Sequence, residues 1–368
     1  MNTIKAQLFS LQTLRGLAAL LVAFYHTIPL LAAYKWHAPA LALFSEWGQL
    51  GVDIFFVISG FVMIISVTGK PQGRETAIAF MRARVARVVP LYWVMTTAMV
   101  LALYFLPAAF NQNKLDGIHA FLSYFFVPYA NSFTGTPRPV LYVGWTLTYE
   151  MFFYLCFSLF LLLPRRSQVL PALIISFSVL VGIGATDPGN LVAKTLTNGL
   201  MVEFVFGCGI GYFYAKGLAL GKTTALVLIA VGTAAFLASI GKVVDLDYRC
   251  LYWGIPASAV VAGAAFLERA GGWPRMSIAT AIGDSSYSLY LSHVFVLPVV
   301  AKLLSSVPVG RSLPGGLVCV LILVASIVSA HVIYLVLERP VTRIAKKALR
   351  IRSIGTTPTE IGGMRETA

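Results

Sequence analysis

The sequence predicts an all-α polytopic membrane protein with about ten transmembrane helices and both termini in the cytoplasm. Of its 368 residues, 58% are hydrophobic and only 11% are charged. A soluble domain of this size has about 25% charged residues to cover its surface. The mean hydropathy of +0.82 agrees with a chain surrounded by lipid. Helices satisfy their own backbone hydrogen bonds in lipid, so apolar helical spans are expected.

Ten apolar segments approach or exceed the ~20 residues that a helix needs to cross the hydrocarbon core. In order along the chain, they are 11–33, 49–68, 84–107, 141–163, 168–185, 195–215, 223–241, 251–268, 279–300 and 315–337. The apolar run 120–130 is too short to cross and is expected to be interfacial or re-entrant. Residues 1–350 are therefore predicted to form one transmembrane domain, followed by a disordered cytoplasmic tail at 351–368.

Basic residues are distributed unevenly between the two sides that ten spans define. The side of the termini carries twenty of the 28 Lys and Arg residues, because the loops of the opposite side hold the other eight. Cytoplasmic loops are enriched in Lys and Arg, so this side is predicted to be cytoplasmic. We therefore attribute the net charge of +14 to the basic residues of cytoplasmic loops, and no nucleic-acid partner is expected. The four cysteines show no metal-binding spacing, and no metal site is expected.

The first span contains two ionisable side chains, which are costly in lipid and are therefore candidates for function. Arg15 and His26 are eleven residues apart, which is three helical turns and about 16 Å along nearly one face. The predicted topology places Arg15 near the cytoplasmic headgroups and His26 past the middle of the bilayer. The structural alternatives are an arginine that anchors the helix and a histidine that hydrogen-bonds to a neighbouring helix.

The second and third spans add a carboxylate and a pair of cations. Asp53 lies near the outer end of the second span, where it could orient or charge-stabilise an imidazole. Arg84 and Arg87 are three residues apart on one helix face at the cytoplasmic end of the third span. Guanidinium groups form paired hydrogen bonds with phosphates, so this face suits a phosphate-bearing ligand. Anchoring of the helix on the positive-inside side is the alternative.

The fourth and ninth spans contain the remaining polar candidates. Glu150 lies at least a full turn inside the fourth span and needs a proton, a cation or a hydrogen-bond donor there. A structural pairing is as compatible with the sequence as a direct role in chemistry. In the ninth span, Ser286, Tyr290 and His293 are spaced i, i+4 and i+7 on one face, and Tyr287 lies close to it. This hydroxyl-rich stripe is expected to form the wall of a substrate pocket.

Five segments in this order resemble the acyltransferase-3 family of integral membrane acyltransferases. They are the R-X10-H of Arg15–His26, GVDIFFVISGF at 51–61, RARVARVVPLYW at 82–93, WTLTYEMFFY at 145–154 and SYSLYLSH at 286–293. Together they cover most of the chain. Its length is similar to that of the exopolysaccharide-production, ExoZ-type members.

The resemblance implies an acyl-CoA-dependent O-acetyltransferase of the bacterial inner membrane. Such an enzyme moves an acetyl or other acyl group from cytoplasmic acyl-CoA to a carbohydrate hydroxyl, on an exopolysaccharide, an O-antigen or a lipid-linked glycan. The resemblance also implies that His26 is catalytic and that Arg15, Arg84 and Arg87 are functionally important. From their inner position we infer that these arginines bind the CoA phosphates.

Within this reaction, His26 is expected to act as a general base, and an acyl-histidine intermediate is the alternative. Asp53 or Glu150 is expected to fix its tautomer, and hydroxyls of the ninth span are expected to stabilise the oxyanion. Acetyl-CoA is a substrate, and no bound cofactor is expected.

Two other classes of function remain open from the sequence. Ten spans with buried polar groups also suit a polysaccharide or glycolipid transporter or flippase, although no inverted repeat is recognisable. A non-catalytic membrane partner in polysaccharide assembly could keep the same fold, although the intact His26 and R-x-x-R motif favour an enzyme.

Overall fold

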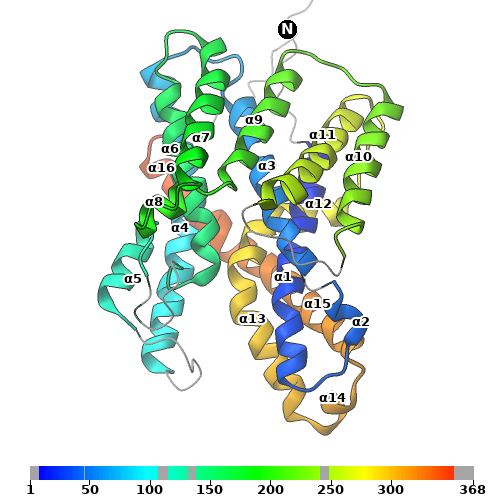
Figure 1. Ribbon diagram of the computed structural model, residues 1–368. Coiled ribbons are helices and arrows are strands. Elements are labelled where there is room, and N and C mark those ends of the chain that lie inside the picture. The colour runs from blue at the N-terminus through cyan, green and yellow to red at the C-terminus, as the bar shows by residue number, and fades with distance from the viewer. Residues whose placement is uncertain are drawn as a thin grey trace, which may run out of the picture.

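The computed structural model describes residues 8–44, 46–106, 115–130, 132, 138–240 and 248–351, and this part of the chain consists of helices without strands (Figure 1). Nine of the described helical segments are long and apolar enough to cross a membrane. The predicted all-α polytopic fold is thus confirmed. The predicted tail from residue 352 onward lies outside the described residues, and the cytoplasmic orientation of the termini stays a prediction.

The long helices follow the predicted spans closely. They are α1 (Phe9–Ala33), α3 (Leu50–Val67), α4 (Arg74–Phe105), α6 (Trp145–Phe160), α7 (Val169–Gly184), α9 (Met201–Ala215), α11 (Ile255–Arg269), α13 (Ser286–Ser306) and α15 (Gly315–Ile333). The predicted span 223–241 corresponds to α10 (Lys222–Leu237), whose 16 described residues are about 24 Å long. This helix is apolar but shorter than the other nine.

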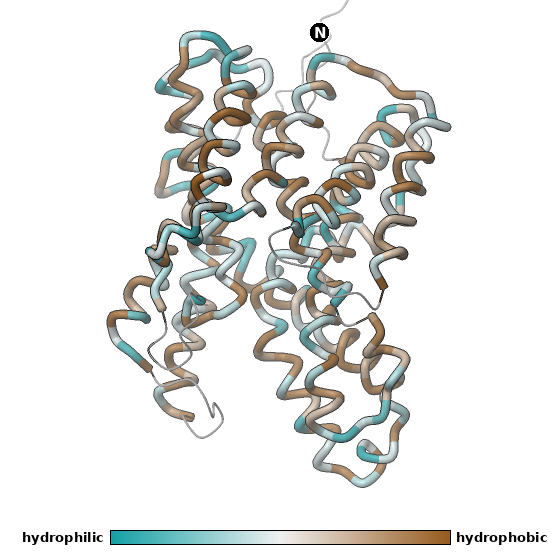
Figure 2. Tube along the Cα trace, viewed as in Figure 1, coloured by the Kyte–Doolittle hydropathy of each residue, from teal (hydrophilic) through white to brown (hydrophobic). Residues whose placement is uncertain are grey.

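Short helices connect the spans. They are α2 (Pro39–Ala42), α5 (Gly117–Tyr124), α8 (Leu191–Leu196), α12 (Ser277–Asp284) and α14 (Pro308–Ser312), while α16 (Arg339–Ala348) follows the last span. Two π-helical segments, η6 (Cys250–Gly254) and η7 (Tyr334–Glu338), precede α11 and α16. The apolar run 120–130 includes the end of α5, so it does not cross. Figure 2 shows long hydrophobic stretches on helices such as α7 and α10.

Hydrogen bonds near the helix ends show which helix ends lie together at each of the two ends of the helix bundle. On one side, the backbone N–H groups of Phe9 and Ser10 donate to the carboxylate of Glu268, over 2.9 and 2.7 Å. These bonds join the start of α1 to the end of α11. On the other side, the indole of Trp36 donates to the carbonyl of Gly310 over 2.9 Å and joins the segment that follows α1 to α14. Arg15 therefore lies toward the first side, and His26 lies farther toward the second.

Helix α3 is held against α9 by glycines that let the two backbones approach. A Cβ atom on Gly60 would lie 2.0 Å from the carbonyl oxygen of Phe204, and one on Gly207 would lie 2.0 Å from that of Val57. Small residues allow such close contacts between membrane helices. This packing fixes the position of α3, which contributes several side chains to the site described below.

The close contact predicts a large difference between two glycines of the same region. Gly60→Ala is expected to destabilise the protein by at least about 1–3 kcal/mol, because backbone on α9 must move to admit the methyl group. Gly209→Ala is the matched control, since nothing lies within 4 Å of its added Cβ. Thermal unfolding of both variants in detergent measures the difference, and equal melting temperatures would contradict this account of the α3–α9 contact.

Candidate active site

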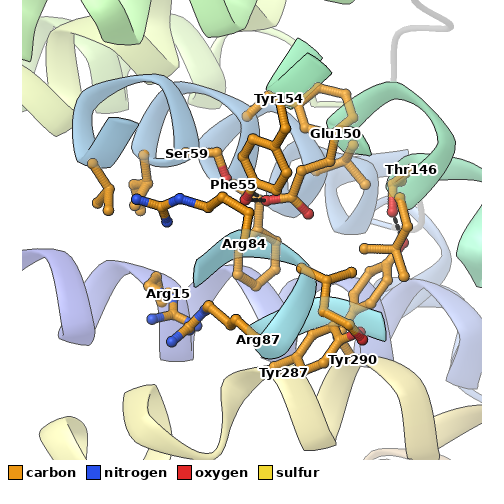
Figure 3. A pocket seen from close by; sticks show the side chains of 16 residues that line it. Arg15, Phe55, Ser59, Arg84, Arg87, Thr146, Glu150, Tyr154, Tyr287 and Tyr290 are labelled. Atoms are coloured by element: carbon orange, nitrogen blue, oxygen red, sulfur yellow. Dashed lines mark hydrogen bonds between the residues drawn. The ribbon is translucent and has the colours of Figure 1, made fainter. Parts of the chain in front are cut away.

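A cavity of about 160 Å³ lies between α1, α3, α4, α6 and α13. Its lining side chains are Arg15, Val52, Phe55, Phe56, Ile58, Ser59, Val62, Arg84, Arg87, Val88, Thr146, Leu147, Glu150, Tyr154, Tyr287 and Tyr290. Figure 3 shows the guanidinium groups of the three arginines gathered toward one end, while Thr146 and Tyr290 lie toward the other. Side chains from five segments far apart in the sequence therefore form one elongated polar site.

The three arginines at the first end lack carboxylate partners among the described residues, in which the ion pairs are Asp53–Arg249 and Asp187–Lys194. Arg15 donates from Nη1 to Gln12 Oε1 over 3.1 Å, and Gln12 in turn donates to Asp284 Oδ1 over 2.8 Å. The Gln12 amide therefore holds the Arg15 guanidinium without neutralising it.

Arg84 is held by aromatic rings. Its guanidinium carbon lies 5.1 Å from the ring centre of Phe80 and 5.6 Å from that of Tyr154. Its Nε atom is buried and has no hydrogen-bond partner in the described part of the chain. Rings contribute attraction without charge neutralisation. The arginine end of the cavity thus presents guanidinium groups that form no ion pair in the described residues, which suits an anion.

Glu150 projects into the middle of the cavity. It accepts hydrogen bonds from the hydroxyl of Ser59, over 2.9 Å, and from that of Tyr154. Tyr154 follows Glu150 by four residues on the same helix face, a spacing from which this contact could have been anticipated. The structural pairing considered for Glu150 therefore exists, and its donors are hydroxyl groups of α3 and α6.

His26 lies beyond the far end of the cavity and is connected to it through aromatic rings. Its ring centre is 5.2 Å from that of His293, with an angle of 24° between the planes, and 5.2 Å from that of Tyr142 in an edge-on arrangement. The ring of His293 lies 6.0 Å from that of Tyr290, which lines the cavity. The rings of Tyr290 and His293 thus connect the cavity to His26.

The hydroxyl of Tyr290 is anchored at this junction. It lies 2.8 Å from the backbone carbonyl of Val143 and 2.8 Å from the hydroxyl of Thr146. Tyr287 lines the cavity nearer the arginines and donates to the carbonyl of Val88 over 2.7 Å. Ser286 is buried, and its hydroxyl has no partner among the described residues.

Asp53 has a partner other than His26. Its two carboxylate oxygens accept from Nε and Nη2 of Arg249, over 3.0 and 2.8 Å, and both side chains are buried. Arg249 also donates to the side-chain and backbone oxygens of Gln49. These contacts join the start of α3 to the segment before α11. In this structure Asp53 therefore stabilises the packing of α3, toward the same side of the membrane as His26.

Sequence reasoning missed Glu338, a buried carboxylate at the end of η7. It accepts a hydrogen bond from Ser288 over 2.7 Å, and η7 packs against α4, the helix of Arg84 and Arg87. Its signal in the sequence is a lone acidic residue at the end of the last span. No group of three or more His, Cys, Asp or Glu side chains in the described residues could hold a metal ion.

Comparison with known proteins agrees with the resemblance of the sequence motifs. The acyltransferase domain of the acyltransferase-3 family matches residues 8–334. The exopolysaccharide production protein ExoZ of Rhizobium meliloti (strain 1021) is 35% identical over 308 residues, which are 80% of this chain and 90% of ExoZ. No solved structure matches the chain.

More distant relatives include two proteins that are named as acyltransferases. The peptidoglycan O-acetyltransferase OatA of Listeria monocytogenes is 25% identical over 334 residues, which are 80% of this chain but only 50% of OatA. The acyltransferase MdmB of Streptomyces mycarofaciens is 25% identical over 346 residues, 87% of this chain and 86% of MdmB. The family match covers nearly all of the membrane-spanning region, and the chain belongs to the acyltransferase-3 family of multi-pass membrane acyltransferases.

Proposed function

We propose that this protein is an acyl-CoA-dependent O-acetyltransferase of the bacterial inner membrane, with His26 as its general base. Its acceptor is a hydroxyl of an exopolysaccharide or another surface glycan. One observation carries the proposal: a single cavity has three cations without carboxylate partners at one end, and at its other end Tyr290 is connected to His26 through the ring of His293. The relatives named O-acetyltransferase and exopolysaccharide production protein support this reaction class and acceptor.

The arginine end suits the charged part of acyl-CoA. Phosphates do not enter lipid without compensation, so the nucleotide stays at the membrane surface. Arg15, Arg84 and Arg87 offer guanidinium groups that form short, charge-assisted hydrogen bonds with phosphate oxygens. The thin pantetheine arm then extends along the cavity toward Tyr290. Basic residues predominate on the side of this end, which is the side predicted to be cytoplasmic.

The imidazole end suits the chemical step. His26 takes the proton of the glycan hydroxyl as the oxygen attacks the thioester carbonyl carbon. The tetrahedral oxyanion collapses, and the C–S bond breaks to release the CoA thiolate, which receives the proton. Thr146 and Tyr290 lie near the cavity end, and the hydroxyl of Tyr290, once released from the carbonyl of Val143, donates to the oxyanion. Because Tyr290 lies along this route, rotation of its side chain is part of the proposed mechanism. Acyl transfer through a nitrogen of His26 remains the alternative route.

The role of the arginines predicts a selective loss of donor binding. Arg84→Ala and Arg87→Ala are each expected to raise the KM for acetyl-CoA by about 10- to 100-fold, because each removes a hydrogen bond between charged groups. Arg82→Ala is the matched control on the same helix, since Arg82 is exposed and does not line the cavity. Initial rates in membranes across acetyl-CoA concentrations measure the effect. Equal KM values for the Arg82 and Arg84 variants would contradict the assignment.

The proposed function itself is tested with purified protein and with the host polysaccharide. Radiolabel from [14C]acetyl-CoA is expected to appear in the glycan fraction only when the protein is present. Mass spectrometry of the surface polysaccharide should show acetyl groups that disappear when the gene is deleted. Movement of a glycan or glycolipid across liposomes without acetyl transfer would instead place the protein among transporters and refute the proposal.

A further inference from the structure

The imidazole of His293 is fixed in one tautomer by the backbone. Its Nδ1 atom lies 3.1 Å from the carbonyl oxygen of Leu289, in the preceding turn of α13. A carbonyl only accepts hydrogen bonds, so Nδ1 must carry a proton, and Nε2 of the neutral ring keeps its lone pair. His293 is 0% exposed, and Nε2 has no hydrogen-bond partner among the described residues.

A buried acceptor without a donor is costly and invites a functional explanation. The ring beside it is that of His26, at a centre-to-centre distance of 5.2 Å with 24° between the planes. Two coplanar imidazoles joined by one N–H···N bond have centres about 5 Å apart, from a bond of about 3 Å and a ring radius of about 1 Å on each side. The rings are stacked in this structure, so forming this bond requires the His26 side chain to turn to the Nε2 edge of His293, while His293 keeps its bond to Leu289.

A general-base histidine is usually assisted by an acceptor that orients it and stabilises its protonated form, as the carboxylate does in a Ser-His-Asp triad. The two carboxylates expected to do so are engaged elsewhere. Asp53 binds Arg249, and Glu150 accepts from Ser59 and Tyr154. Among the described neighbours of His26, His293 is a side chain that can act as this acceptor instead of a carboxylate.

We propose that His293 is the positioning residue for His26 and that its Nε2 accepts a hydrogen bond from the protonated His26 imidazole. During transfer, one nitrogen of His26 receives the proton of the acceptor hydroxyl, while the N–H of the other nitrogen donates to His293. His293 neither gains nor loses a proton. This inference rests on the proposed function, because it requires His26 to hold a proton during turnover.

Side chains that keep or remove the acceptor test the inference. His293→Asn can place its amide near the position of Nδ1 and keep the bond to Leu289, but it does not reach the position of Nε2. His293→Phe keeps a packed ring without nitrogen. It provides a second variant without the acceptor, so the role of Nε2 can still be tested if one of the two variants does not fold. His293→Gln can reach the position of Nε2 with its amide oxygen. Folded yield and melting temperature are measured for all three variants.

The Asn and Phe variants are expected to lose about 10- to 100-fold in kcat, the value of a hydrogen bond to a charged group, with an unchanged KM for acetyl-CoA. The Gln variant is expected to recover most of this loss. In a His26→Ala background, the same substitutions should cause no further loss, because His293 acts through His26. A wild-type kcat in the folded Asn or Phe variant, or a Gln variant as slow as Asn, would overturn the inference.

The same experiment separates this inference from the proposed function. If His26→Ala is inactive while His293→Phe keeps the wild-type kcat, His26 remains the base and only the role of His293 is wrong. If His26→Ala is fully active, the proposed mechanism fails together with the inference.

Discussion

His26→Ala is expected to slow acetyl transfer to the glycan by about 10²- to 10⁴-fold while the protein still inserts and folds. A positioned general base contributes about 10²- to 10⁴-fold in rate, and no other imidazole near the cavity is free to replace it if His293 acts as proposed. The measurement is the transfer of label from [14C]acetyl-CoA to glycan in membranes with matched amounts of folded protein.

A second histidine provides the control for this experiment. His331 lies on α15, where its ring neighbours that of Tyr334 at 6.2 Å, and it does not line the cavity. His331→Ala is expected to keep close to wild-type activity. Full activity of His26→Ala, or equal losses in both variants, would remove His26 from the reaction.

Breaking the buried Asp53–Arg249 pair is expected to produce the largest loss of stability. Arg249→Ala leaves the carboxylate of Asp53, which is 0% exposed, without its cation. Removal of one partner of a buried ion pair typically costs about 3–5 kcal/mol. The variant should therefore show a strongly lowered melting temperature in detergent and a low yield of folded protein.

Two further variants separate a scaffold role from a catalytic one. The double variant Asp53→Leu, Arg249→Met removes both members of the pair and is expected to recover much of the stability, because neither is left buried without the other. Asp187–Lys194 is an ion pair whose side chains are 72% and 56% exposed, and Asp187→Asn should have little effect. If Asp53→Asn melts like wild type but loses activity, Asp53 acts in the reaction and its assignment to the scaffold is wrong.

The positions of the spans follow from the sequence because bilayer thickness dictates length and hydropathy over about 20 residues. Nine of the ten predicted segments correspond to helices that can cross, and the tenth corresponds to the shorter α10. The predicted orientation relative to the cytoplasm rests on the charge distribution alone. The length and hydropathy of a helix are the same whichever of its ends faces the cytoplasm.

The grouping of the arginines at one end of the cavity can also be predicted from the sequence. Arg84 and Arg87 share a helix face through local periodicity, and Arg15 was placed at the same depth by the predicted topology. The structure shows all three lining one cavity with Glu150. Local spacing and depth in the bilayer were sufficient because these properties do not depend on which helices pack together.

The contacts around His26 were beyond sequence reasoning because they depend on helix packing. Asp53 and His26 lie toward the same side of the membrane, so an Asp–His contact was reasonable until the fold placed Arg249, 196 residues away, beside Asp53. The apposition of His26 and His293 requires α1 and α13 to be neighbours. Glu338 lies in the π-helical segment η7, which packs against α4. No local pattern in the sequence predicts this segment.

The structure of the protein with CoA bound tests the central claim most directly. A cryo-EM map is predicted to show the phosphates within hydrogen-bond distance of Arg15, Arg84 and Arg87, with the pantetheine arm along the cavity and the thiol next to Tyr290. CoA bound outside this cavity, or with its phosphates at the His26 end, would contradict the claim that donor and base meet through this site.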